Sequence, residues 1–136
     1  MKLSFIQMKK IYYLEIKAAR DTSKKKYLKA INYYEKIIRI LPEPKKQWDE
    51  YVLVNMSMAD AYFTSGDYYN AEKCYAEILY PLRKSAFILM MYGQTQYFLN
   101  NLELAEKYLK KAYELDGSDL FKFEDPLFLR MATKKV

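Results

Sequence analysis

Two stretches of this sequence align without a gap and decide the fold: ADAYFTSGDYYNAEKCY at residues 59–75 and GQTQYFLNNLELAEKYL at residues 93–109. A small residue begins each stretch, and Ala71 in the first corresponds to Ala105 in the second. These two alanines are 34 residues apart. A repeat of this length predicts helix pairs that stack along the chain, because one pair cannot bury its apolar face alone.

A third and more degenerate copy lies upstream, where an aromatic residue, Ala30 and a tyrosine repeat the spacing found around Ala71. The two alanines are 41 residues apart, which is seven more than one period, and the extra residues fall at 43–49. Pro44 suits the first position of a helix. We therefore expect the extra residues to lengthen the following helix at its start.

Apolar periodicity and the few glycines and prolines predict an all-helical chain. Gly66 and Pro81 are expected to break helices, and Asp125 is expected to cap a short helix that begins with Pro126. The expected helices are 3–20, 24–41, 44–65, 67–80, 82–99, one that ends near 116–117, and a short one at 125–131.

The composition excludes several kinds of active site. The chain has 136 residues and is 51% hydrophobic, which predicts one packed domain. It has no histidine and one cysteine, Cys74, so it has no Ser-His-Asp triad and no His- or Cys-rich metal site. Glu15 and Asp60 are the carboxylates expected on the sides of their helices that also carry exposed apolar residues. Without a phosphate loop or a nucleophile–base pair, we expect no enzyme activity, no cofactor and no metal.

The repeated pattern resembles the tetratricopeptide repeat (TPR) over roughly residues 10–117. The resemblance implies an all-α fold, a three-repeat right-handed helical solenoid with a short C-terminal capping helix. We expect a single TPR domain, 1–136, with repeats at about 11–42, 45–83 and 86–117 and a capping segment at 118–136. The family's usual activity is to bind a protein or peptide in the groove lined by the first helix of each pair.

A second resemblance rests on Leu41-Pro42-Glu43-Pro44, Trp48 and the closing segment 123–129. These features are similar to small bacterial TPR proteins that resemble immunity proteins encoded beside Rhs or contact-dependent toxins. The resemblance implies a protein that binds and neutralises a cognate toxin domain. The same fold would serve a general protein or peptide adaptor, or a TPR scaffold that self-associates into a homo-oligomer.

Helical spacing places an apolar and aromatic set of residues on the groove side. The expected partner-binding residues are Tyr12, Glu15, Leu53, Met56, Asp60, Phe63, Phe87, Met90, Gln94, Tyr97 and Phe98. Such side chains suit a helix or an extended segment of a partner. Two readings stay open: the groove binds a partner, or the chain's own tail at 120–123 and 127–129 fills it. The basic and amide residues that clamp carboxylates in some TPR proteins are missing.

Charge is uneven along the chain. Residues 1–46 hold 13 Lys and Arg against 4 Asp and Glu, and the basic patch Lys24, Lys25, Lys26 and Lys29 lies at the first turn. The patch favours an acidic protein partner, or is a solvated surface. Nucleic-acid binding is the weaker alternative, because arginines are few and no nucleic-acid motif occurs.

The sequence contains no run of about 18 apolar residues and no cleavable export segment. We therefore expect a cytoplasmic protein without membrane contact. Taken together, the sequence predicts a non-catalytic protein-binding module, with toxin neutralisation as the sharper hypothesis.

Overall fold

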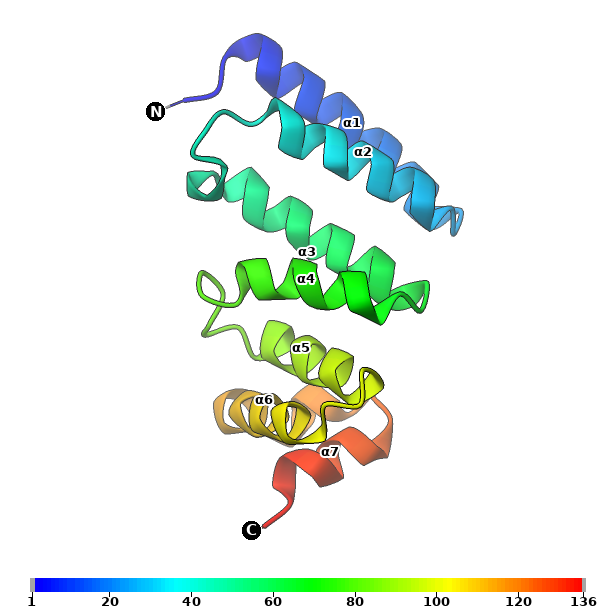
Figure 1. The fold of residues 1–136 in the computed structure, drawn as a ribbon, viewed down its shortest axis with the longest axis vertical. Helices are drawn as coiled ribbons and strands as arrows, with labels where there is room; N and C mark the ends of the chain where they lie inside the picture. The colour runs from blue at the N-terminus through cyan, green and yellow to red at the C-terminus, as the bar shows by residue number, and fades with distance from the viewer. Residues whose placement is uncertain (1, 136) are drawn as a thin grey trace. The chain divides into compact units, whose positions relative to one another are not determined.

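The computed structural model describes residues 2–135, and over this range it contains helices and turns but no strand (Figure 1). The chain forms two compact units, an N-terminal unit (Met1–Asp67) and a C-terminal unit (Tyr68–Val136). The first holds α1 (Phe5–Ser23), α2 (Tyr27–Ile40), the short 3-10 helix η1 (Lys45–Gln47) and α3 (Asp49–Thr64). The second holds α4 (Tyr68–Ile78), α5 (Ala86–Phe98), α6 (Leu102–Asp116), η2 (Ser118–Phe121) and α7 (Pro126–Thr133).

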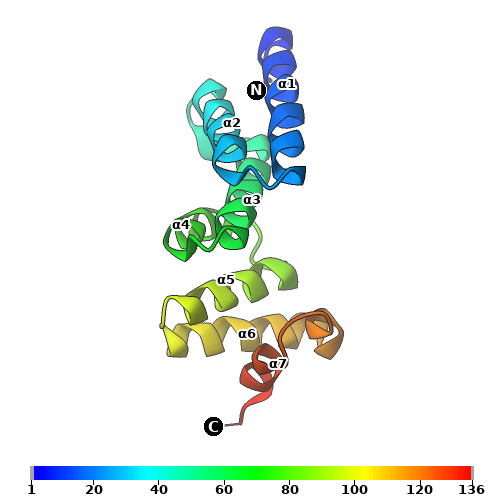
Figure 2. The same ribbon diagram turned by 90° about the vertical axis from the view of Figure 1, so that its right-hand side faces the viewer.

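In the N-terminal unit α2 packs against both α1 and α3, and Figure 2 shows α1 and α2 side by side. α1 begins with a capping box, because the Gln7 amide donates to Ser4 Oγ and the Ser4 amide donates to the Gln7 side chain. Small and branched apolar side chains fill the interface between these helices. The fully buried ones include Ala18 from α1, Ala30 and Ile37 from α2, and Ala59 from α3.

The expectation that the extra residues lengthen the third helix is wrong. Pro44 has extended backbone with ψ 125°, and the residues after it form η1 before α3 begins at Asp49. Trp48 precedes α3 and is buried, and its indole Nε1 donates to the Pro42 carbonyl at 2.8 Å. The insertion therefore folds back as a loop that is anchored by its tryptophan.

Lys45 attaches the same loop to the end of α2. Its ammonium donates to the carbonyl oxygens of Ile38, at 2.8 Å, and Leu41, at 2.6 Å. These carbonyls lie in the last turn of α2, where no amide of the next turn is available to them. A positive charge at this end of a helix is favourable, so Lys45 serves both the helix and the loop.

The C-terminal unit surrounds α5 with other helices. α5 packs against α4 on one side and most closely against α6, and ten of its residues are buried. Gly93 makes this close approach possible, because a Cβ atom there would lie 2.9 Å from Leu109 Cγ and 3.2 Å from the Ala105 carbonyl oxygen. The small residues that define the repeat are thus the points where helices touch.

The remaining boundaries agree with the sequence to within a few residues, with one shift. Residues 82–84 are turn rather than helix, so α5 begins at Ala86 with Ser85 as its cap. Gly66, with φ 86°, ends α3 as expected. Asp125 caps α7 through a hydrogen bond from the Leu127 amide at 2.9 Å, as expected for an Asp-Pro helix start.

We retain the division into one domain with three repeats as a proposal. Each repeat expected from the sequence contains two consecutive helices, and the capping segment contains η2 and α7. Within residues 2–135, no helix is long and apolar enough to cross a membrane.

Candidate functional site

An apolar stripe lies exposed along α1. Phe5, Met8, Tyr12 and Ile16 follow one another at intervals of three and four residues, which places them on one side of the helix. Their exposed fractions are 71%, 50%, 67% and 44%. The stripe therefore adds nothing to the core, which α1 reaches through Ile11 and Ala18 instead.

α3 exposes a second set of side chains in the same unit. Leu53 is 54% exposed, Asp60 is exposed, and Met56 and Phe63 are half-buried. Their spacing of three and four residues again places them on one side of the helix. We call the four α1 residues of the stripe together with Leu53, Met56 and Asp60 the open face.

Two carboxylates connect the two halves of the open face. Burial raises the pKa of Glu15 on α1, and the negative charge of Glu50 on α3 raises it further. Glu50 is half-buried at the start of α3, as Glu15 is in the middle of α1. Helical spacing puts Glu15 beside Tyr12 and Glu50 beside Leu53, so the two carboxylates lie between the apolar sets.

Asp60 adds a third carboxylate to this surface. Its side chain is exposed, yet the neighbouring groups remove part of its hydration and raise its pKa. Among residues 2–135, no lysine or arginine forms an ion pair with Glu15, Glu50 or Asp60. The open face is therefore apolar with three carboxylates that form no ion pair within the described residues, and the Lys9 ammonium lies at its edge, 5.4 Å from the centre of the Phe5 ring.

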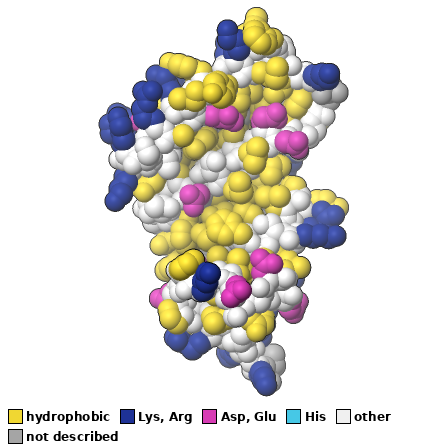
Figure 3. All heavy atoms as spheres, turned by 180° about the vertical axis from the view of Figure 1, so that it is seen from behind, with side chains coloured by type: hydrophobic (Ala, Val, Ile, Leu, Met, Phe, Trp, Pro, Cys, Tyr) yellow, Lys and Arg dark blue, Asp and Glu magenta, His cyan; other side chains and the backbone are white. Residues whose placement is uncertain are grey.

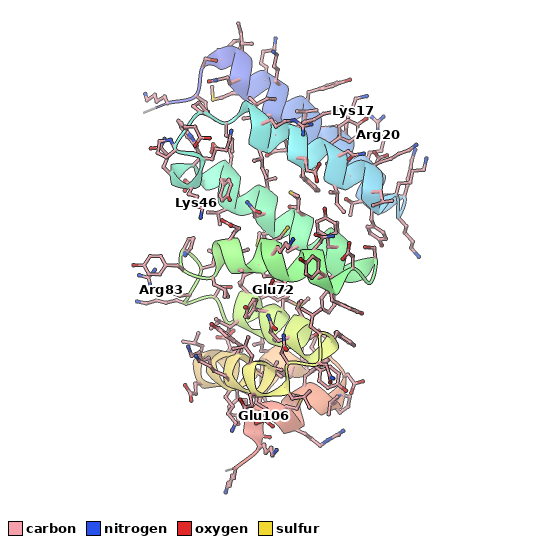
Figure 4. All side chains as sticks on the ribbon, viewed as in Figure 1. Lys17, Arg20, Lys46, Glu72, Arg83 and Glu106 are labelled. Carbon is pink, nitrogen blue, oxygen red and sulfur yellow. The ribbon has the colours of Figure 1, made fainter. Side chains whose placement is uncertain are left out.

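Figure 3 shows the corresponding distribution over the N-terminal unit: hydrophobic side chains gather on the face, Asp and Glu lie among them, and Lys and Arg lie toward the margin. Lys17 and Arg20 project from the second half of α1 (Figure 4). The Lys17 ammonium lies 5.0 Å from the centre of the Tyr13 ring, a cation–π contact.

In the C-terminal unit, some of the residues that were expected to line the groove are buried. Met90 and Gln94, which were expected in the groove, are buried, with exposed fractions of 1% and 3%. The Gln94 side-chain amide donates to Glu124 Oε1 at 2.7 Å. These two residues are therefore not accessible to a partner in this structure, and Glu124, in the segment after α6, lies on Gln94.

Aromatic side chains complete this closure. Phe128 of α7 is buried, and its ring centre lies 5.4 Å from that of Tyr97 and 6.1 Å from that of Phe98. Phe98 also stacks on Tyr68 at 4.4 Å, and remains 44% exposed. In this unit the chain's own tail occupies the surface, whereas Phe87 stays half-exposed beside it.

The structure also identifies residues that the sequence reasoning missed. Phe5, Met8 and Ile16 extend the surface around Tyr12, and their apolar spacing could have identified them. Glu50 was missed because its neighbour Glu15 lies on another helix. Lys24, Lys25, Lys26 and Lys29, the basic patch of the sequence analysis, are exposed around the α1–α2 turn, beside Leu28, which is 76% exposed.

The groups that could hold a metal or act as acids, bases or nucleophiles were also located. In the described part of the chain, no group of three His, Cys, Asp or Glu side chains could hold a metal ion. Cys74 is buried in α4. The Tyr92 hydroxyl donates to Glu72, which lies on α4, at 3.3 Å (Figure 4), and burial together with Glu72 raises the pKa of Tyr92 to about 12.

The sequence matches two known protein-family models. Residues 54–80 and 88–119 match the family model described as the tetratricopeptide repeat. Residues 5–61 match the model described as the MIT domain of autophagy-related protein 38. A search of curated proteins found no match.

Two solved structures resemble the whole chain. The first TPR of Spaghetti (RPAP3) bound to the HSP90 peptide SRMEEVD is 24% identical with a TM-score of 0.69, covering 92% of this chain and 91% of that one. The Sgt2 TPR domain from Aspergillus fumigatus is 20% identical with a TM-score of 0.67, covering 90% of this chain and 76% of that one. Both likenesses concern the fold.

Proposed function

Because the chain is a tetratricopeptide-repeat protein, we propose that it is a non-catalytic protein-binding module whose partner docks on the open face of the N-terminal unit. One observation carries this proposal. Phe5, Met8, Tyr12 and Ile16 on α1 and Leu53 on α3 are large apolar side chains with exposed fractions between 44% and 71%. Large apolar side chains gathered at the surface in this way mark interaction sites.

The kind of partner is suggested by the fold neighbours. The RPAP3 structure holds a peptide, as its description states. A helical or extended protein segment is therefore the occupant that we propose here. Tyr and Met side chains supply large and adaptable contacts to such a segment.

The experiment begins with a tagged copy purified from its native cells after nuclease treatment at moderate salt. A stoichiometric partner is identified by mass spectrometry and its affinity for the purified chain is measured. We expect Tyr12→Ala combined with Leu53→Ala to weaken binding at least tenfold. The matched control is Tyr69→Ala, which removes another exposed aromatic ring, 63% exposed, from α4.

Equal affinities for the wild type and the Tyr12→Ala, Leu53→Ala variant would refute the assignment to the open face. An equal loss in the Tyr69→Ala control would refute it as well. Far-UV circular dichroism confirms that each variant is folded.

Toxin neutralisation is the finer form of this proposal, and it rests on the resemblance drawn from the sequence. It requires one tight partner with a toxin-like domain, and protection of cells by the wild-type chain. Loss of protection in the Tyr12→Ala, Leu53→Ala variant would support it. Several weak partners would favour the adaptor alternative instead.

A further inference from the structure

We propose that the open face takes an amphipathic helix of a partner protein, with lysine or arginine beside its apolar residues. This inference rests on the proposed function and names the chemistry of the partner. It follows from the shape of the apolar surface and from the charges that lie within it.

The shape of the surface favours a helix. From Phe5 to Ile16 the stripe rises by eleven residue steps along α1, which is about 16 Å at 1.5 Å per residue. That length matches three turns of a partner helix, whose anchors recur at i, i+3, i+4 and i+7. Leu53 and Met56 on α3 supply a second wall for the same helix.

The charges favour a basic partner. Glu15 lies three residues from Tyr12 on α1, and Glu50 and Asp60 lie three and four residues from Leu53 and Met56 on α3, so helical spacing places all three carboxylates beside the apolar side chains. A lysine or arginine on the partner would relieve the repulsion between the two glutamates and form charge-assisted hydrogen bonds. An acidic peptide such as the SRMEEVD held by the RPAP3 structure would bring like charges together.

The net charge of the chain distinguishes binding at the open face from nonspecific electrostatic attraction. The whole chain carries a formal charge of +6. Nonspecific attraction would therefore favour an acidic ligand, whereas the open face favours a basic one. A preference for a basic helix would have to come from local carboxylates.

The test uses two synthetic peptides of 18 residues with leucine at the same i, i+3, i+4 and i+7 positions. One carries four lysines beside the leucines and the other carries four glutamates. Fluorescence anisotropy at about 0.15 M salt measures their affinities, because screening beyond about 8 Å suppresses long-range effects there. We expect the lysine peptide to bind at least tenfold tighter than the glutamate peptide.

Charge-removing variants locate the preference. In Glu15→Gln combined with Glu50→Gln, we expect the affinity for the lysine peptide to fall about three- to tenfold, the range for two partly exposed ion pairs. The control is Glu43→Gln, which removes one carboxylate from the exposed α2–α3 loop of the same unit. It should change the affinity for the lysine peptide less than twofold.

Three peptide-binding results would overturn the inference: equal or tighter binding of the glutamate peptide, no binding of either peptide, or an unchanged preference in the double glutamine variant. If both peptides bind equally and Leu53→Ala weakens both, the proposed function stands and only the basic partner is wrong. Sedimentation of the chain without peptide measures whether a second copy of the chain binds the open face. A dimer that the double glutamine variant dissolves would make a second copy the occupant and would also overturn the inference.

Discussion

Replacing Gly93 with alanine tests whether the small residues of the repeat act through close helix contact. The added Cβ would lie 2.9 Å from Leu109 Cγ, 3.1 Å from Leu109 Cδ2 and 3.2 Å from the Ala105 carbonyl oxygen. Leu109 is fully buried, its Cγ is a branch point rather than a free tip, and the carbonyl belongs to the α6 backbone. Neither group can move away without shifting α6.

Two opposing effects set the magnitude. Adding a methyl group to a packed interface costs about 1–3 kcal/mol. Alanine in place of glycine inside a helix stabilises it by about 1 kcal/mol. We therefore expect Gly93→Ala to lower the free energy of unfolding by up to about 2 kcal/mol, although the same change in an open helix would raise it by about 1 kcal/mol.

A double-mutant cycle with Leu109→Ala isolates the contact. Leu109→Ala alone should cost about 2–5 kcal/mol through the cavity it leaves. In that background the clash with the leucine is gone, so Gly93→Ala should be neutral or stabilise by up to about 1 kcal/mol. Urea unfolding followed by far-UV circular dichroism measures all four proteins. A gain in stability from Gly93→Ala in both backgrounds would refute the reasoning.

Three further predictions concern single side chains. Glu15→Gln should raise the free energy of unfolding at pH 7. The pKa of Glu15 is raised in the folded state, so ionising this carboxyl above its ordinary pKa of 4.5 destabilises the fold, and glutamine removes that loss. In urea titrations the stability difference between the variant and the wild type should vanish as the pH falls to 4.5. Tyr92→Phe should lose less stability than the wild type between pH 10 and about 12, since the native state keeps Tyr92 neutral there while the unfolded state ionises; alkaline unfolding curves measure this. Lys45→Met should lower the unfolding free energy by about 1–2 kcal/mol, because the carbonyls of Ile38 and Leu41 lose the lysine ammonium that donates to them. Glu43→Gln should change the unfolding free energy by less than about 0.5 kcal/mol. Thermal unfolding distinguishes the two variants.

The fold was predictable where short-range spacing carries the physical constraint. The repeated small residues lie at close helix contacts: Ala105 is fully buried, and a Cβ atom added at Gly93 would lie 3.2 Å from the Ala105 carbonyl oxygen. Gly66 and Asp125 announce a helix end and a helix start through their own backbone and side-chain chemistry. Such features are local, so the sequence alone contains them.

The loop before α3 was not predictable for the opposite reason. Trp48 lies four residues before Val52, a spacing that also fits a helix. Its actual role depends on a hydrogen bond to Pro42 and on Lys45 reaching back to α2. Periodicity within a window cannot distinguish a buried loop residue from one more turn of helix.

The candidate site was half predictable. Tyr12 and Leu53 are exposed as the spacing indicated. Gln94 is covered because Glu124, thirty residues later, accepts its hydrogen bond. A contact at this sequence distance leaves no mark on the local pattern. The short helix at 125–131 was predictable, whereas the packing of its Phe128 against Tyr97 and Phe98 was not.

The contrast between the two units also decides where binding and folding can be studied separately. Tyr97 contacts Phe98 and Phe128 in the core of the C-terminal unit, so its replacement would disturb packing and any binding together. Tyr12 and Leu53 are more than half exposed, and substitutions at such positions usually change stability by less than about 0.5 kcal/mol. A loss of partner binding at these two residues with unchanged unfolding would therefore report on the surface itself, because the core of the N-terminal unit does not depend on them.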